Sequence, residues 1–277
     1  MVKATTSFPA DLQARLVACE ERHSCRIALA LHDPLVPANS FSWRAKEPFL
    51  AASTMKVPVM MEVFRLAEQG RLDLSHRVTI DPLFRSIADH SPFVVEGARE
   101  LQPRVGGEAT LLELVEQMIV LSDNLATNLL LARTGTAPVT ALIRSLGVED
   151  CHVLRHLMDE NAARLGIANT VTAEGLNRLM EAIATGRAAS PSSCREMIRI
   201  LLAQQYRDMI PAGIPPSVPV ANKTGWEDDM AHDTAIVFAP AGNYYLTILS
   251  DHLPLHVKGN AFAPELSRII WENCRPS

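Results

Sequence analysis

The spacing of apolar residues predicts a helix near the start of the chain and strands directly after it. Between residues 10 and 22, apolar positions recur at the intervals of one helix face. The stretch 25–32 is mostly apolar and predicts a buried strand. Pro34 and Pro37 then indicate a turn, and a second short strand is predicted at 41–44.

The middle of the chain has a helical pattern that begins at Ser53. Thr110-Leu-Leu-Glu113 has the form of a capping box, in which the first and last residues each satisfy a main-chain N–H at a helix start. This helix is predicted to end near residue 120. Further helices are predicted from Thr136 to Gly147, from Thr172 to about Gly186 and from Ser193 to Gln204.

Strand patterns return near the end of the chain, at 218–223, 234–238 and 244–249, before a closing helix at 264–273. Strands at both ends with helices between them predict an α+β fold, in which the two ends of the chain build one antiparallel sheet. We therefore expect a sheet lobe formed by 1–52 and 205–277 and a mainly helical lobe formed by 53–204. A cleft between the two lobes is the expected place for a site.

The 277 residues are 48% hydrophobic and carry a net charge of −5, which is typical of a globular protein. The basic residues form no run that could follow a phosphate backbone, so nucleic acid is excluded as a partner. No segment approaches the ~18 continuous apolar residues of a membrane span. Since residues 1–9 lack the pattern of an export signal, the sequence as written predicts a cytoplasmic monomer, or a periplasmic or secreted one if a leader has been removed.

The sequence predicts neither a metal site nor a cofactor. It has no C-x-x-C unit, and no H-E-x-x-H frame surrounds His152 and His156, which are interpreted as surface or packed side chains. The five cysteines are expected to be free, mostly buried thiols, although one disulfide stays open for an exported protein.

The candidate chemistry begins with Ser53-Thr-Met-Lys56, directly before an apolar helical stretch. This spacing places both side chains on one helix face. A serine hydroxyl becomes a nucleophile when a base takes its proton, and a lysine can be that base if burial or nearby cations lower its pKa. Main-chain N–H groups at the helix start can help to hold a developing oxyanion.

Two further triplets strengthen this interpretation. An S-x-x-K spacing alone is expected by chance roughly 0.3 times in such a chain. Here it is joined by Ser122-Asp-Asn124, directly after the helix that begins at Thr110, and by Lys223-Thr-Gly225, at the end of a predicted strand. Together the three are expected by chance on the order of once in ten thousand sequences, so they are interpreted as parts of one active site.

In this order the three elements resemble those of the class A β-lactamases and penicillin-binding proteins. Residues 121–128 also resemble that family's segment in which the second triplet separates two helices. The resemblance runs from about Ser53 to Gly225. It implies a β-lactamase/transpeptidase-like fold, with a five-stranded antiparallel sheet flanked by helices and packed against an all-helical lobe.

The resemblance also implies roles for the matching residues. Ser53 would attack the substrate carbonyl, Lys56 would accept its proton, and Ser122 would pass a proton to the leaving nitrogen. The N–H groups of Ser53 and Trp226 would form the oxyanion hole. The substrate-binding residues would be Asn124, Lys223, Thr224, Gly225 and Trp226, with the substrate carboxylate held by Lys223 and Thr224.

The resemblance is incomplete at the residue that would activate water for deacylation. Class A β-lactamases carry a glutamate in an E-x-x-L-N segment between the second and third elements, and this sequence lacks that segment. Glu160 is the candidate base in the comparable stretch, but it is interpreted as a solvated acid at a loop or helix end. Glu174 falls in the first turn of a predicted helix, where an acid is expected for the helix dipole alone.

The sequence therefore predicts a serine β-lactamase-like hydrolase of class A type that forms an acyl-enzyme at Ser53. The expected partner is a small-molecule substrate, a β-lactam or an acyl-peptide or ester. Three alternatives stay open: a D,D-peptidase or esterase-like protein, a penicillin-binding sensor that deacylates slowly, and a protein in which Ser53 is inert.

Overall fold

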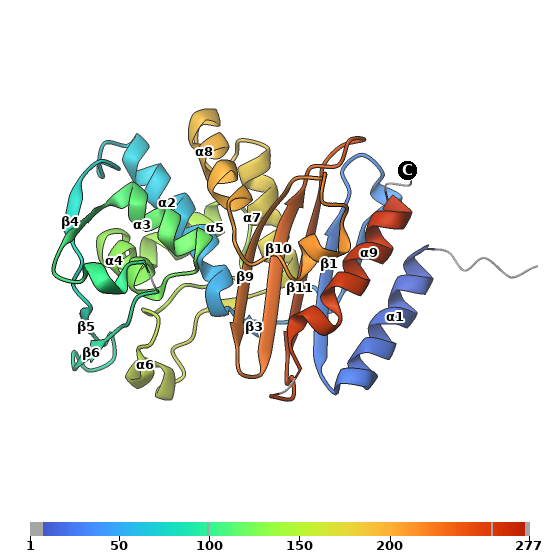
Figure 1. Ribbon diagram of the computed structural model, residues 1–277, viewed down its shortest axis with the longest axis horizontal. Coiled ribbons are helices and arrows are strands. Elements are labelled where there is room, and N and C mark those ends of the chain that lie inside the picture. The colour runs from blue at the N-terminus through green and yellow to red at the C-terminus, as the bar shows by residue number, and fades with distance from the viewer. Residues whose placement is uncertain (1–7, 99, 256, 275–277) are drawn as a thin grey trace, which may run out of the picture.

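A five-stranded antiparallel sheet forms the centre of the molecule (Figure 1). The computed structural model describes residues 8–98, 100–255 and 257–274. Across the sheet the strands are β2 (Phe41–Trp43), β1 (Arg26–His32), β11 (Tyr244–Asp251), β10 (Met230–Val237) and β9 (Val220–Glu227). Because β1 pairs with β11, the first and last long strands of the chain lie side by side. The prediction of a sheet built from both chain ends is confirmed.

Two helices from opposite ends of the chain cover one face of this sheet (Figure 1). They are α1 (Phe8–His23) and α9 (Ala263–Cys274). Leu12 and Leu16 of α1 and Leu266 and Ile270 of α9 are fully buried there. In each helix the two residues are four apart and so lie on one face. Burial of such a side chain stabilises the fold by about 1.5–3 kcal/mol.

Helix α7 (Ala173–Ala184) lies against the opposite face of the sheet, where it contacts β1, β10 and β11. Its buried Asn177 binds this helix to the strands. The Asn177 amide donates to the carbonyl oxygens of Ala30, at 2.9 Å, and Tyr245, at 3.2 Å, and its oxygen accepts from the Thr247 hydroxyl at 2.7 Å. A buried amide with these partners incurs little desolvation cost.

Helix α2 (Lys56–Glu68) occupies the centre of the helices beyond α7 (Figure 1). Apolar residues surround most of its circumference, which is typical of a buried helix. Pro58 is its third residue, a position whose N–H has no partner within the helix, so the proline does not break it. The surrounding helices are α3 (Leu111–Val120), α4 (Asn124–Thr134), α5 (Thr136–Ser145) and α8 (Pro191–Leu202).

Short elements connect these helices. A five-residue helix, α6, covers Glu160–Arg164. The paired short strands are β3 (Phe49–Leu50) with β8 (Thr170–Val171), β4 (Arg77–Thr79) with β7 (Glu108–Thr110), and β5 (Leu83–Arg85) with β6 (Pro92–Val94). The sequence did not indicate these six strands, because two or three residues are too few to produce an alternating pattern. None of the helices within the described ranges is long and apolar enough to cross a bilayer.

Most predicted boundaries agree with the structure, but two strands are longer than predicted: β10 begins at Met230, before the predicted 234, and β9 continues past the predicted 223. The capping box at α3 is confirmed, since the Glu113 N–H donates to the Thr110 hydroxyl at 3.1 Å and the Thr110 N–H to the Glu113 carboxylate at 2.6 Å. The Lys223-Thr-Gly225 triplet does not end its strand, because β9 continues to Glu227. Glycine usually weakens a strand, but here Gly225 stays in the ladder, where it pairs with His232 of β10. The division into lobes at 53 and 205 stays a prediction. Helix α7, which belongs to the middle segment, packs on the sheet.

Candidate active site

Ser53 lies in a tight 3-10 turn, η2 (Ala52–Met55), that opens directly into the buried helix α2. Ala52, just before Ser53, has a φ of +42°, in the left-handed region. This conformation costs a non-glycine residue of the order of 1–3 kcal/mol, so its surroundings must hold it. Thr54 contributes by donating its N–H, at 3.0 Å, and its hydroxyl, at 2.6 Å, to the Ala51 carbonyl oxygen.

The buried amine of Lys56 is the centre of the polar contacts in the site. Its Nζ lies 2.9 Å from Ser53 Oγ and 3.2 Å from Ser122 Oγ. It also lies 2.6 Å from the carbonyl oxygen of Ser122 and 2.8 Å from Asn124 Oδ1. The S-x-x-K and S-D-N elements, far apart in the chain, therefore meet at one nitrogen atom.

The environment of Lys56 favours its neutral form. Burial, together with the positive charge of Lys223, lowers the pKa of Lys56 well below its usual range, while Asp123 acts in the opposite direction. A neutral amine donates two hydrogen bonds and accepts one through its lone pair. Lys56 can therefore donate to the Ser122 carbonyl and to Asn124 while it accepts the hydroxyl proton of Ser53.

Ser122 is presented by a sharp turn between α3 and α4, in which its φ is +58°. The next residue, Asp123, is buried and caps α4 by accepting the N–H of Ala126 at 2.7 Å. This cap fixes the start of α4 at Asn124. Both residues that flank Asp123 are thereby held against Lys56.

Lys223 extends from the middle of β9 to the same serine. Its buried Nζ donates to Ser122 Oγ at 3.0 Å and to the Thr224 carbonyl oxygen at 2.7 Å. Burial lowers the pKa of Lys223 to about 7, although the Asp233 carboxylate acts to raise it. The Thr224 hydroxyl is buried and has no hydrogen-bond partner within the described residues.

Gly225 brings β9 into close contact with the turn that carries Ser53. A Cβ atom at this position would lie 2.8 Å from the Ser53 nitrogen and 3.1 Å from the Thr54 nitrogen. Only glycine permits this approach without a shift of main chain. The next residue, Trp226, is half exposed, and its ring meets that of Tyr206 edge-on with the centroids 4.6 Å apart.

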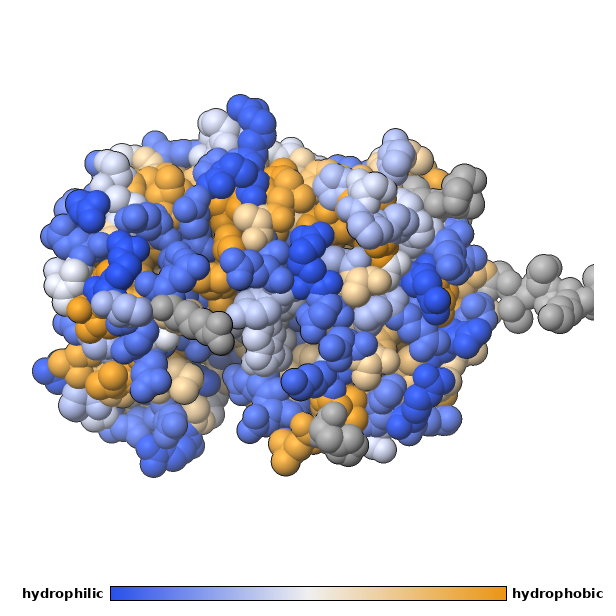
Figure 2. Space-filling view, viewed as in Figure 1, coloured by the Kyte–Doolittle hydropathy of each residue, from blue (hydrophilic) through white to orange (hydrophobic). Residues whose placement is uncertain are grey.

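A cleft of about 590 Å³ lies between the helical part and the β9–β10 hairpin. Figure 2 shows the surface hollowed at its lower margin, between the side of α6 and the side of the hairpin. Ser53, Asn124 and Trp226 line the cleft, and so does Glu160, the exposed first residue of α6. The structure therefore places the predicted deacylation candidate in the same cleft as the predicted nucleophile.

Leu157 is a lining residue that sequence reasoning did not find. The fully buried side chain of Asn128 holds it: the Leu157 N–H donates to Asn128 Oδ1, and Asn128 Nδ2 donates to the Leu157 carbonyl, both at 2.9 Å. Asn128 lies in the segment that resembles the family, which was the available signal. The side chain of Leu157 thus borders the cleft, while the Asn128 side chain holds its main chain.

Arg155 and Glu227 are two further lining residues. The sequence places Glu227 at the edge of the site, directly after Trp226, but it does not indicate Arg155. Burial raises the pKa of the Glu227 carboxyl, and Arg155 acts in the opposite direction. Neither residue belongs to one of the three motifs. They are close because the β9–β10 hairpin and the loop before α6 face each other across the cleft.

Fold and site together are those of a serine hydrolase, with Lys56 beside Ser53 and an antiparallel sheet covered by helices. The sequence model of the β-lactamase enzyme family matches residues 11–274, and the chain belongs to this family. The resemblance inferred from the three motifs is therefore confirmed.

Individual relatives agree with this assignment. A β-lactamase from Mycobacterium tuberculosis (strain ATCC 25177 / H37Ra) is 30% identical over 264 residues, which cover 90% of this chain and 80% of that protein. The crystal structure of a β-lactamase from Sphaerobacter thermophilus DSM 20745 is 29% identical, with a TM-score of 0.82 over 95% of this chain and 96% of that one. An ancestral class A β-lactamase is 27% identical, with a TM-score of 0.80 over 94% and 99% of the two chains. The predicted fold and the predicted class A type of serine β-lactamase-like hydrolase are confirmed.

Proposed function

We propose that this protein hydrolyses the amide bond of β-lactams through an acyl-enzyme formed at Ser53. The observation that carries the proposal is the 2.9 Å contact between Ser53 Oγ and the buried amine of Lys56. The lowered pKa of Lys56 favours the neutral amine, the form that can accept the proton of a serine nucleophile. The name β-lactamase, which the relatives carry, supports the substrate class.

In acylation, the Ser53 hydroxyl gives its proton to the Lys56 lone pair while Oγ bonds to the lactam carbonyl carbon. The N–H groups of Ser53 and Trp226 stabilise the oxyanion, an interaction whose loss typically lowers kcat by about 10²–10³-fold. The carbon–nitrogen bond then breaks. The leaving nitrogen takes the hydroxyl proton of Ser122, and Ser122 is reprotonated by Lys56 across the 3.2 Å between their polar atoms.

Substrate binding involves the other predicted residues. Lys223, in its protonated form, attracts the carboxylate next to the lactam ring, and the unpartnered hydroxyl of Thr224 is available to the same group. Asn124, which lines the cleft, binds the amide of the substrate side chain. Gly225 allows β9 to approach closely enough for these contacts.

Deacylation requires a base for the attacking water, whose oxygen bonds to the ester carbon while Ser53 Oγ leaves and recovers a proton. Glu160 and Glu227 are the glutamates that line the cleft within the described residues. We keep Glu160 as the candidate and expect slow deacylation if neither carboxylate reaches the ester. We also infer that the protein acts as a monomer, with its site between the predicted sheet and helical lobes.

A chromogenic cephalosporin tests the proposal. Steady turnover that Ser53→Ala abolishes, with exposed Ser217→Ala as the matched control, supports a β-lactamase. A single stoichiometric burst instead indicates a penicillin-binding protein that stays acylated. If a fluorescent penicillin fails to label the wild-type protein, Ser53 is inert towards β-lactams and the proposal is wrong.

A further inference from the structure

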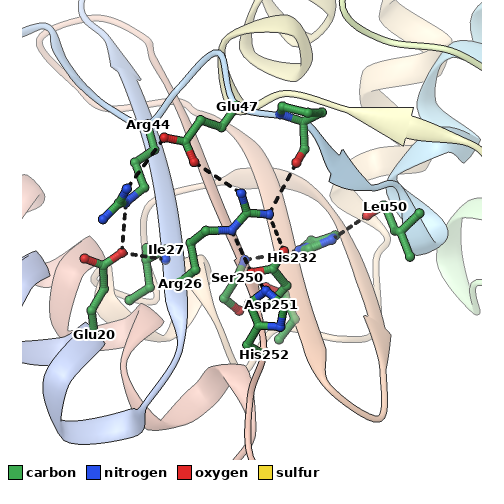
Figure 3. Close-up of polar contacts among 12 residues, drawn as sticks. Glu20, Arg26, Ile27, Arg44, Glu47, Leu50, His232, Ser250, Asp251 and His252 are labelled. Carbon is green, nitrogen blue, oxygen red and sulfur yellow. Dashed lines mark hydrogen bonds and ion pairs between the residues drawn. The ribbon is translucent and has the colours of Figure 1, made fainter.

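The imidazole of His232 is fully buried on β10, against the main chain that leads into the Ser53 turn. Its Nε2 lies 2.8 Å from the carbonyl oxygen of Leu50, as Figure 3 shows. The ring of Phe49 stands edge-on to it, with the centroids 6.1 Å apart. In the β9–β10 ladder the partner of His232 is Gly225, the residue that contacts the Ser53 turn.

The second ring nitrogen fixes which tautomer is present. The Ser250 N–H donates to His232 Nδ1 at 3.3 Å, so Nδ1 is an acceptor and carries no proton (Figure 3). Nε2 therefore carries the proton and donates it to the Leu50 carbonyl. Both nitrogens of the neutral ring thus form hydrogen bonds. A proton on Nδ1 would place two N–H donors against each other and break the bond from Ser250.

The peptide group between Leu50 and Ala51 is consequently held from two sides. His232 binds its carbonyl oxygen from the sheet, and its N–H donates to the Asn169 carbonyl oxygen at 2.9 Å. The Asn169 side chain in turn accepts the Arg155 N–H at 3.0 Å, in the loop that lines the cleft. The next residue in the chain is Ala52, with its strained positive φ.

We propose that His232 is a positioning residue that holds the strained Ser53 turn in register with β9 through its hydrogen bond to Leu50. The inference rests on the proposed function in one respect, since it expects this hydrogen bond to speed the acylation of Ser53. Without this bond, the turn loses its link to the sheet directly before Ala52, the residue with the strained φ. The Ser53 and Trp226 N–H groups then lose their alignment. A displacement of about 1 Å in such a site can lower the rate by about 100-fold.

Charged groups surround the ring without contacting its nitrogens. Arg26 of β1 lies over the Phe49 ring at 4.1 Å and donates to Asp251 of β11 and Glu47 of the preceding loop (Figure 3). Burial lowers the pKa of His232, and Asp251 and Asp229 act to raise it. The ring is therefore neutral near pH 7, and because its pKa is lowered it keeps both hydrogen bonds at pH values below about 6.5, the ordinary pKa of histidine.

The test compares His232→Phe, which removes both hydrogen bonds, with His232→Gln, whose amide can still donate to Leu50. Ser267→Ala is the matched control, because it removes one buried hydrogen bond, 2.8 Å to the Ile210 carbonyl, on the opposite side of the sheet. We expect His232→Phe to lower the acylation rate by fluorescent penicillin at least about 10-fold. His232→Gln should stay within about 3-fold of the wild-type rate at pH 7, because its amide still donates to Leu50. Ser267→Ala should lower only the Tm.

Amide hydrogen exchange reads the positioning independently of chemistry. In His232→Phe, the peptide that covers 50–55 should exchange faster than in wild type, and in Ser267→Ala it should not. The inference is overturned if His232→Phe leaves this exchange unchanged, or if it acylates as fast as Ser267→Ala. If penicillin never labels the wild-type protein while His232→Phe still exchanges faster over 50–55, the positioning role is upheld and the proposed function is rejected.

Discussion

The main chains of Gly225 and Ser53 pass so closely that a single added methyl group at Gly225 would lie 2.8 Å from the Ser53 nitrogen. Strand β9 and the turn η2 are therefore in direct main-chain contact. The proposed oxyanion hole therefore depends on the approach of two segments that are separated by more than half of the chain.

Gly225→Ala should impair acylation far more than it impairs folding. The two nearest atoms that the new Cβ meets, the nitrogens of Ser53 and Thr54, belong to main chain, which cannot turn away, so we expect the N–H groups of Ser53 and Trp226 to separate. We expect a loss of about 100-fold in kcat/KM, similar to removal of one oxyanion donor. Steady-state kinetics with a penicillin checks this, with exposed Gly107→Ala as the control. Wild-type kinetics in Gly225→Ala would show that the contact has no catalytic importance.

The pH dependence of kcat/KM should have two limbs. The rate falls on the acid side as Lys56 becomes protonated, and on the alkaline side above about 7 as Lys223 loses the charge that attracts a carboxylate. Lys223→Arg keeps its charge throughout, so we expect this variant to lose the alkaline limb and keep the acid one. An alkaline limb that persists in Lys223→Arg would assign it to another group.

Glu160→Gln should have little effect on acylation. Glu160 is exposed at the start of α6, where an acid also suits the helix dipole. Mass spectrometry after mixing with a penicillin measures the acylated fraction, and Glu227→Gln provides the comparison from the other side of the cleft. If Glu160→Gln alone traps the acyl-enzyme, Glu160 is the deacylation base and its interpretation as a solvated acid is wrong.

Asn128→Leu should destabilise the fold, because it leaves the N–H and the carbonyl of Leu157 without their partner. We expect a loss of about 2 kcal/mol in the free energy of unfolding. For a chain of this size that corresponds to a fall in Tm of about 4–8 °C. Thermal denaturation measures it, with Asn273→Ala on the exposed side of α9 as the control. Equal Tm values for the two variants would contradict the role of Asn128.

The motifs predicted much of the site because each is local. Ser53 and Lys56 are one helical turn apart, and Asp123 caps a helix, so short-range rules suffice to place them. Leu157 and His232 were not found in this way. Their importance depends on contacts with Asn128 and Leu50, which are 29 and 182 residues distant in the chain. No local pattern reports such pairs.

By itself, the sequence determined the α+β class, the sheet built from both chain ends, the capping box at Thr110 and the three motifs. Each of these depends on residue periodicity or on chemistry within a few positions. Only the tertiary structure decided that the pKa of Lys56 is lowered, that β9 runs through Gly225 against Ser53, and which carboxylates border the cleft. Burial and distance decide these properties, and both arise when distant segments pack together.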